Sequence, residues 1–172
     1  MEREGHVLLV EALSASAPDD VRAAARALGV LGDPRAAGPL LAALERGLLS
    51  TEAVLVEALR RVEAPGRDDR LLQLLSRWEA QAENTGDPDV DQWRFTSDPT
   101  PIRNLLYTSS HPAGLQLLIR DLKALRENDL WDKVPSGGPV SAALTTGGAA
   151  TLALHGLLVA DNPATRRWAA YC

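Results

Sequence analysis

The chain has 172 residues and a net charge of −5, with 45% hydrophobic and 24% charged residues. This length suffices for one compact domain with a buried core, and the composition is that of a globular protein. Residues 1–84 carry 10 basic and 14 acidic side chains, and the remainder carries 8 and 9. Because neither half has the basic excess that a phosphate backbone demands, composition argues against nucleic acid as a general partner.

The cysteine content and the length of the apolar segments indicate in which cellular compartment the protein is expected. The one cysteine, Cys172, is the last residue, so no internal disulfide can form, as is typical of a reducing cytosol. The longest apolar stretch near the C-terminus, residues 149–160, is too short to span a bilayer. We therefore expect a cytoplasmic protein that is not bound to a membrane.

Ala and Leu dominate the hydrophobic residues and aromatics make up only 4%, which favours an all-α fold. A first helix is expected over residues 5–15, and a 31-residue period begins within it. Internal repeats of this length are typical of stacked helical hairpins. The residues that align at this period are Leu9, Leu40 and Leu71; Val10, Leu41 and Leu72; and Leu13, Leu44 and Leu75.

The spacing inside each copy is helical, because apolar residues recur three and four positions apart. Between two such segments, Gly32 is suited to end a helix in the left-handed conformation. Asp33 then suits the N-cap, and Pro34 the first position of the next helix. Each copy is thus predicted to be a helix–turn–helix hairpin.

The stretch from Asp19 to Leu44, which includes this turn, resembles the HEAT repeat in its short bacterial form. The resemblance covers residues 16–78 and weakens beyond them. It implies paired antiparallel helices stacked into a right-handed superhelix, with the second helix of each pair lining the concave side.

The second half keeps the pattern with altered spacing. A shift of 78 residues places His111-Pro112 on Asp33-Pro34, so an insertion interrupts the period, and residues 85–101 lack helical periodicity. A weaker copy follows at Asn162-Pro163. We therefore predict an all-α, right-handed α-solenoid of about four hairpins in a single domain, residues 1–172. Its parts are regular hairpins over 1–84, an inserted loop over 85–101, and divergent hairpins with a C-terminal cap over 102–172.

Aromatic residues gather around the insertion, where no repeat core requires them. Because Trp, Tyr and Arg are enriched among interface residues that dominate binding, we select them as candidate binding residues. An alternative is that Trp93 and Phe95 pin the loop back onto the helices. The candidates are Trp78, Trp93, Arg94, Phe95, Tyr107 and Trp131.

Metal and cofactor chemistry find no support in the motifs. His6, His111 and His155 are isolated, without the partner at helical spacing that zinc sites use. The acidic run Asp87–Asp91 lacks the central Gly and closing Glu of a calcium loop. No phosphate-binding or nucleophile motif is present. We expect neither a metal nor a cofactor, and we name no catalytic residue.

The leading hypothesis is a scaffold that binds a protein or peptide through its concave helices and the 85–101 loop. The acidic bias of the first half favours a partner with basic patches. One alternative is an enzyme, because the arrangement resembles that of the HEAT-like alkylpurine DNA glycosylases, which use aromatic side chains and a carboxylate. Trp78, Trp93 and Asp89 or Asp91 would take those roles, but the basic concave face of those enzymes is missing here. Another HEAT-like family assists bilin attachment. A third possibility is a biosynthetic accessory protein with a small-molecule pocket beside the loop, shaped by Val140–Ala150.

Overall fold

The computed structural model describes residues 2–48, 50–83, 99–109 and 111–124, together with 155, 158–161, 163, 166, 167 and 170. The regular secondary structure of these described residues is entirely helical, which confirms the all-α expectation for this part of the chain. The helices are α1 (Glu2–Ala12), α2 (Pro18–Leu31), the 3₁₀ turn η1 (Pro34–Ala36), α3 (Ala37–Glu45), α4 (Glu52–Arg61), α5 (Arg67–Glu83), α7 (Thr100–Tyr107) and α8 (Pro112–Ala124).

The chain divides into two compact units, Met1–Ile102 and Arg103–Cys172. The first contains α1 to α5, and the second contains α8 and most of α7. The expectation of a single domain over residues 1–172 stays a prediction. Most of the expected 85–101 loop lies outside the described residues, but Thr100 and Pro101 begin α7, so those two positions are helical.

The turn between α2 and α3 follows the sequence closely. Gly32 has φ 63° and its N–H donates to the Leu28 carbonyl, so a left-handed glycine ends α2 as predicted. The Asp33 carboxylate accepts from the Arg35 N–H at 2.9 Å. Hydrogen bonds from the side chain and backbone of Arg35 lower the pKa of Asp33 from 3.8 to about 2. Pro34 opens a 3₁₀ turn rather than the α-helix itself, which begins at Ala37.

The first helix also differs at its ends from the range that periodicity predicts. It runs from Glu2 to Ala12 rather than over residues 5–15. Beyond Ala12 the chain tightens, because the N–H groups of Ser14 and Ala15 bond three residues back, to Glu11 and Ala12. Such i→i−3 bonds are a common way for a helix to satisfy its last carbonyls.

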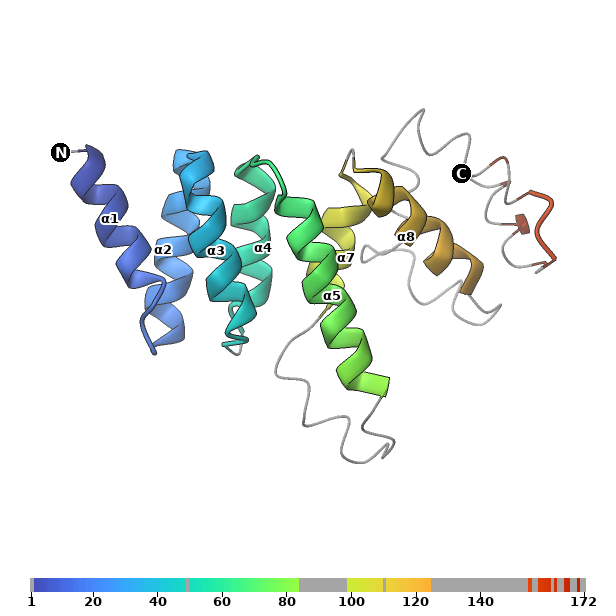
Figure 1. The fold of residues 1–172 in the computed structure, drawn as a ribbon, viewed down its shortest axis with the longest axis horizontal. Coiled ribbons are helices and arrows are strands. Elements are labelled where there is room, and N and C mark those ends of the chain that lie inside the picture. The colour runs from blue at the N-terminus through green and yellow to red at the C-terminus, as the bar shows by residue number, and fades with distance from the viewer. Residues whose placement is uncertain are drawn as a thin grey trace. The chain divides into compact units, whose positions relative to one another are not determined.

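Alternate helices pack side by side in the first unit (Figure 1). Helix α2 makes its most extensive contacts with α4, and α3 packs against both α4 and α5. Helix α1 contacts α2. The Arg46 side chain in the α3–α4 turn donates to the carbonyl of Leu13 just after α1. Helices α2 and α4 therefore form one row, and α1, α3 and α5 form the other.

Leucines that recur at the 31-residue period form the core between the rows. Leu13, Leu44 and Leu75 are 2%, 0% and 2% exposed, so their side chains occupy equivalent buried positions. Leu40 and Leu71 are fully buried, whereas Leu9 at the equivalent position of α1 is only half-buried. The core repeat predicted from the sequence is therefore present in all three copies, and the first copy, at α1, is less deeply buried.

In the second unit, α7 and α8 form a close pair. His111 lies directly before α8, and its Nδ1 accepts from the Ala113 N–H at 3.3 Å, so it caps the helix as its place in the sequence predicts. A side chain at Gly114 would lie 2.2 Å from the Leu106 carbonyl oxygen. Only glycine permits this approach of α8 to the end of α7.

Candidate functional site

The predicted binding residues divide into those that the structure describes and those that it does not. Trp78 is half-buried on α5, and Tyr107 is buried on α7. Trp93, Arg94, Phe95 and Trp131 all lie outside the described residues. Since Trp78 and Tyr107 also belong to different units, the expected aromatic surface around the insertion stays a prediction.

Tyr107 has a clear part in the interior of the second unit. It is 2% exposed, and its hydroxyl donates to Oδ2 of Asp121 on α8. Arg120 donates to the other oxygen, Oδ1, at 2.9 Å. Burial, and then the bond to Asp121, raise the pKa of Tyr107 well above its ordinary value of 10.0. Tyr107 thus ties α7 to α8 through a hydrogen bond.

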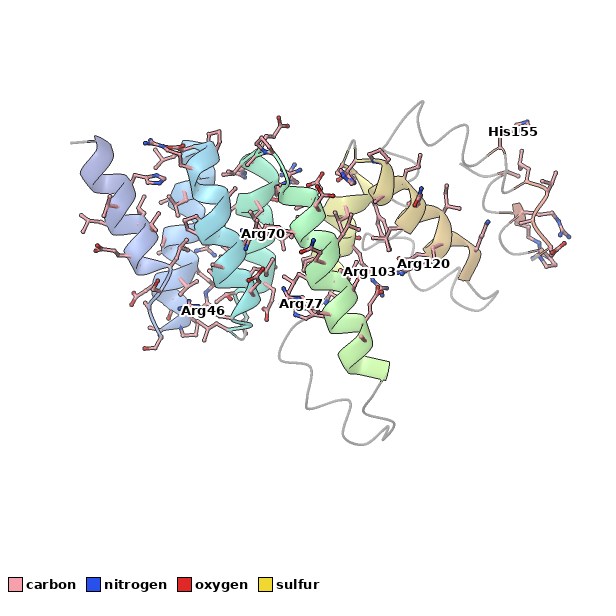
Figure 2. All side chains as sticks on the ribbon, in the orientation of Figure 1. Arg46, Arg70, Arg77, Arg103, Arg120 and His155 are labelled. Carbon is pink, nitrogen blue, oxygen red and sulfur yellow. The ribbon has the colours of Figure 1, made fainter. Side chains whose placement is uncertain are left out.

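An open depression lies between the end of α3 and the exposed side of α5. Its volume is about 660 Å³, and its lining residues are Glu45, Leu72, Gln73, Ser76 and Arg77. The Glu45 carboxylate lies 3.3 Å from Nη2 of Arg70 and 3.5 Å from Nη2 of Arg77. One acidic group therefore pairs with two guanidinium groups of α5, and both arginines are labelled in Figure 2.

The repeat explains why arginines collect here. Arg46 and Arg77 are 31 residues apart and follow equivalent buried leucines, Leu44 and Leu75. Each reaches back toward the end of the preceding helix in its row. Arg46 bonds the carbonyl of Leu13, and Arg77 pairs with Glu45 at the end of α3. Arginine at this position can satisfy helix C-terminal acceptors and remain partly available at the surface.

The same register defines the exposed face of the row formed by α1, α3 and α5. Because side chains at equivalent positions point the same way in each helix, the face can be read directly from the aligned copies. Its members are half-buried or exposed. They are Val7, Gly38 and Asp69; Leu8, Pro39 and Arg70; Glu11, Ala42 and Gln73; Ser14, Glu45 and Ser76; and Ala15, Arg46 and Arg77.

The residues predicted from the sequence did not include Glu45, Arg70 or Arg77. The average charge of residues 1–84 is acidic and favoured a basic partner. The signal was present in the aligned copies, where Arg70 and Arg77 lie seven residues apart, two turns along one side of a helix. That their guanidinium groups converge on Glu45 follows only from the packing of α5 against α3.

The histidines and acidic residues in the described part of the chain do not gather into a metal-binding group of three or more. His6 on α1 lies 3.7 Å, from Nδ1 to Oδ2, from Asp33. That carboxylate already accepts two bonds from Arg35 through Oδ2. The contact therefore belongs to the α2–α3 turn and does not create a site for chemistry.

Comparison with models of known protein families and with curated proteins finds no match. Among the described residues, no helix is both long enough and apolar enough to cross a membrane.

Proposed function

We propose that this chain is a right-handed α-solenoid of HEAT-type hairpins that binds a protein or peptide partner. The binding surface consists of the exposed face of α1, α3 and α5, together with the 85–101 loop. The alternative small-molecule pocket beside that loop falls on residues outside the described part of the chain. The proposed location is the cytoplasm.

The packing order supports the stacked arrangement. Helix α2 lies beside α4, and α3 lies beside α5, so each hairpin contacts the next through like helices. Stacked hairpins bury one continuous core and leave the outer sides of the second helices exposed. The bond from Arg46 to the carbonyl of Leu13 continues this order back to α1.

One observation carries the assignment of a binding face. The depression between α3 and α5 is open, and its lining combines Arg77 with apolar and amide groups at successive turns of α5, while Arg70 pairs with the same Glu45 carboxylate. Arginine is enriched at the positions that dominate protein interfaces. A surface built on two packed helices is also rigid, so a partner meets groups already held in place.

Affinity capture from a native lysate, quantified by mass spectrometry, tests this face. Arg77→Glu places a second carboxylate beside Glu45, and we expect it to remove the captured partner. The matched control is Arg26→Glu on the exposed side of α2, in the other row, and we expect it to retain the partner. If Arg77→Glu keeps its helical content and still captures the partner as well as Arg26→Glu does, the α3–α5 face does not bind it.

The loop is tested separately. Trp93→Ala combined with Phe95→Ala should weaken capture without changing the melting of the first unit, since the loop lies outside the repeat core. If this double variant captures every partner as the original chain does, the loop has no part in binding. The proposed binding surface is then limited to the exposed face of α1, α3 and α5.

A further inference from the structure

The exposed face of α1, α3 and α5 changes in chemical character from one helix to the next. Helix α1 exposes two large apolar side chains, Val7 at 52% and Leu8 at 64%. Helix α3 presents Gly38 and Pro39 at the positions equivalent to Val7 and Leu8, and Ala42 one turn further along, and these residues are small and uncharged. Helix α5 presents Arg70 and Arg77. The face therefore carries large apolar side chains on α1, small uncharged side chains at Gly38, Pro39 and Ala42 of α3, and two arginines on α5.

At the α5 end of the face, two guanidinium groups share one carboxylate, that of Glu45. Arg70 and Arg77 are 45% and 59% exposed and share the one carboxylate of Glu45. A guanidinium group has five N–H donors, so both retain donors directed to solvent. Asp69, the residue before Arg70, takes part in a polar contact of its own. Arg70 and Arg77 are balanced in charge by Glu45 and Asp69, so this end offers a partner spare N–H donors rather than a net positive charge.

We infer that this face binds a peptide segment with acidic side chains at the α5 end and apolar side chains at the α1 end. The inference rests on the proposed function and specifies its partner. Carboxylates match the planar donor pairs of Arg70 and Arg77. Leucine-like side chains cover Val7 and Leu8, which removes apolar surface from water. Glu11, exposed on α1, repels carboxylates there and so sets the direction of the segment.

The helix spacing predicts the separation of the two groups in the partner. Packed helices lie about 8–10 Å apart, so α1 and α5 are separated by roughly 16–20 Å across α3. An extended peptide advances about 3.3 Å per residue. The acidic and apolar residues should therefore be about five or six residues apart. The small side chains of α3 leave room for an extended backbone to cross between them.

Fluorescence anisotropy with synthetic peptides tests the inference on the full chain. The probe peptide carries two glutamates and two leucines separated by about four or five glycine and serine residues, and it is made in both chain directions. We expect at least one direction to bind, and to bind about tenfold more tightly than the same peptide with lysines in place of glutamates. Its affinity should fall as salt is raised, because exposed charges are screened. A spacer of two residues should weaken binding.

Two pairs of variants locate the binding peptide on the face. Arg70→Glu with Arg77→Glu should weaken binding about tenfold, whereas Arg26→Glu on α2 should change it by less than about twofold. Leu8→Asp should also weaken binding. Val30→Asp is its control, since Val30 is an exposed apolar residue of α2, at 75%. All five substituted positions are exposed, so we expect the fold to tolerate these four variants. Equal effects in a variant and its control would overturn the inference.

The outcomes separate this inference from the proposed function. If the lysate partner is lost on Arg77→Glu but the lysine peptide binds as well as the glutamate peptide, the face binds a partner of different chemistry and the inference fails alone. If single-stranded oligothymidylate binds more tightly than the acidic peptide, the arginines serve phosphate groups and the inference is overturned. If neither lysate partner nor peptide binds, both proposals fail.

Discussion

Gly29 sets how closely α2 and α4 approach each other. A β-carbon at this position would lie 2.9 Å from Cα and 3.1 Å from Cβ of Ala58 on α4. Gly29→Ala should therefore force the two helices apart, and we expect the free energy of unfolding to fall by about 1–3 kcal/mol. Urea denaturation followed by circular dichroism measures this loss.

The control for this substitution lies in α3. Gly38→Ala would place its β-carbon in open space, with nothing within 4 Å. Alanine has the higher helix propensity, so this change should leave stability unchanged or raise it by up to about 1 kcal/mol. The same loss in both variants would show that the contact with Ala58 does not cause the effect of Gly29→Ala.

Tyr107 makes the second unit sensitive to high pH. Burial and the bond to Asp121 raise its pKa above the ordinary 10.0, so the folded protein keeps the phenol proton where the unfolded chain loses it. The stability that this contributes is complete below pH 10 and is lost as pH rises above it. Tyr107→Phe should cost about 1–2 kcal/mol at neutral pH, through loss of the hydrogen bond.

Amide hydrogen exchange in α8, measured from pH 7 to 11 in the original chain and in Tyr107→Phe, checks this prediction. The difference in protection between the original chain and Tyr107→Phe should shrink above pH 10, because only the original chain loses stability there through this group. A difference that stays constant through that range would contradict the proposed role of burial and Asp121.

At the scale of an element, α3 shows how strictly the repeat assigns its faces. Leu41 is 2% exposed, whereas the next residue, Ala42, points to solvent. Leu41→Asp places an unpaired carboxylate in the core, and we expect it to cost several kcal/mol and abolish cooperative unfolding of the first unit. Ala42→Asp adds the same charge one position along and should leave the urea midpoint nearly unchanged. Cooperative, unshifted melting of Leu41→Asp would contradict the register.

The ends of the elements were less predictable than their faces. The sequence places Gly32 correctly because a left-handed terminus favours glycine for a local steric reason. It misplaces the start of α3, where Pro34 opens a 3₁₀ turn, and the end of α1, where the chain tightens after Ala12. At both boundaries a backbone N–H can bond the carbonyl of either the third or the fourth preceding residue, and the two arrangements differ little in energy.

For the whole molecule, the division into two compact units predicts separable responses to local damage. In stacked repeats each hairpin draws its stability from its neighbours, so a defect is felt locally. Gly29→Ala should speed amide exchange in α2 and α4 while leaving exchange in α8 unchanged. Hydrogen-exchange mass spectrometry resolves these segments. A uniform increase along the chain would instead show one cooperative domain, as the sequence led us to expect.

The sequence by itself determined the helical class and the buried register of the first unit. Leu13, Leu44 and Leu75 recur at a fixed period, and apolar spacing along a helix specifies its buried side directly. The aromatic binding residues beyond Trp78 and Tyr107 stay predictions. Tertiary structure alone decided that Arg70 and Arg77 share Glu45, because the packing of α5 against α3 brings together groups 25 and 32 residues apart. Composition averages charge along the chain, whereas a binding partner meets the local charge of a surface.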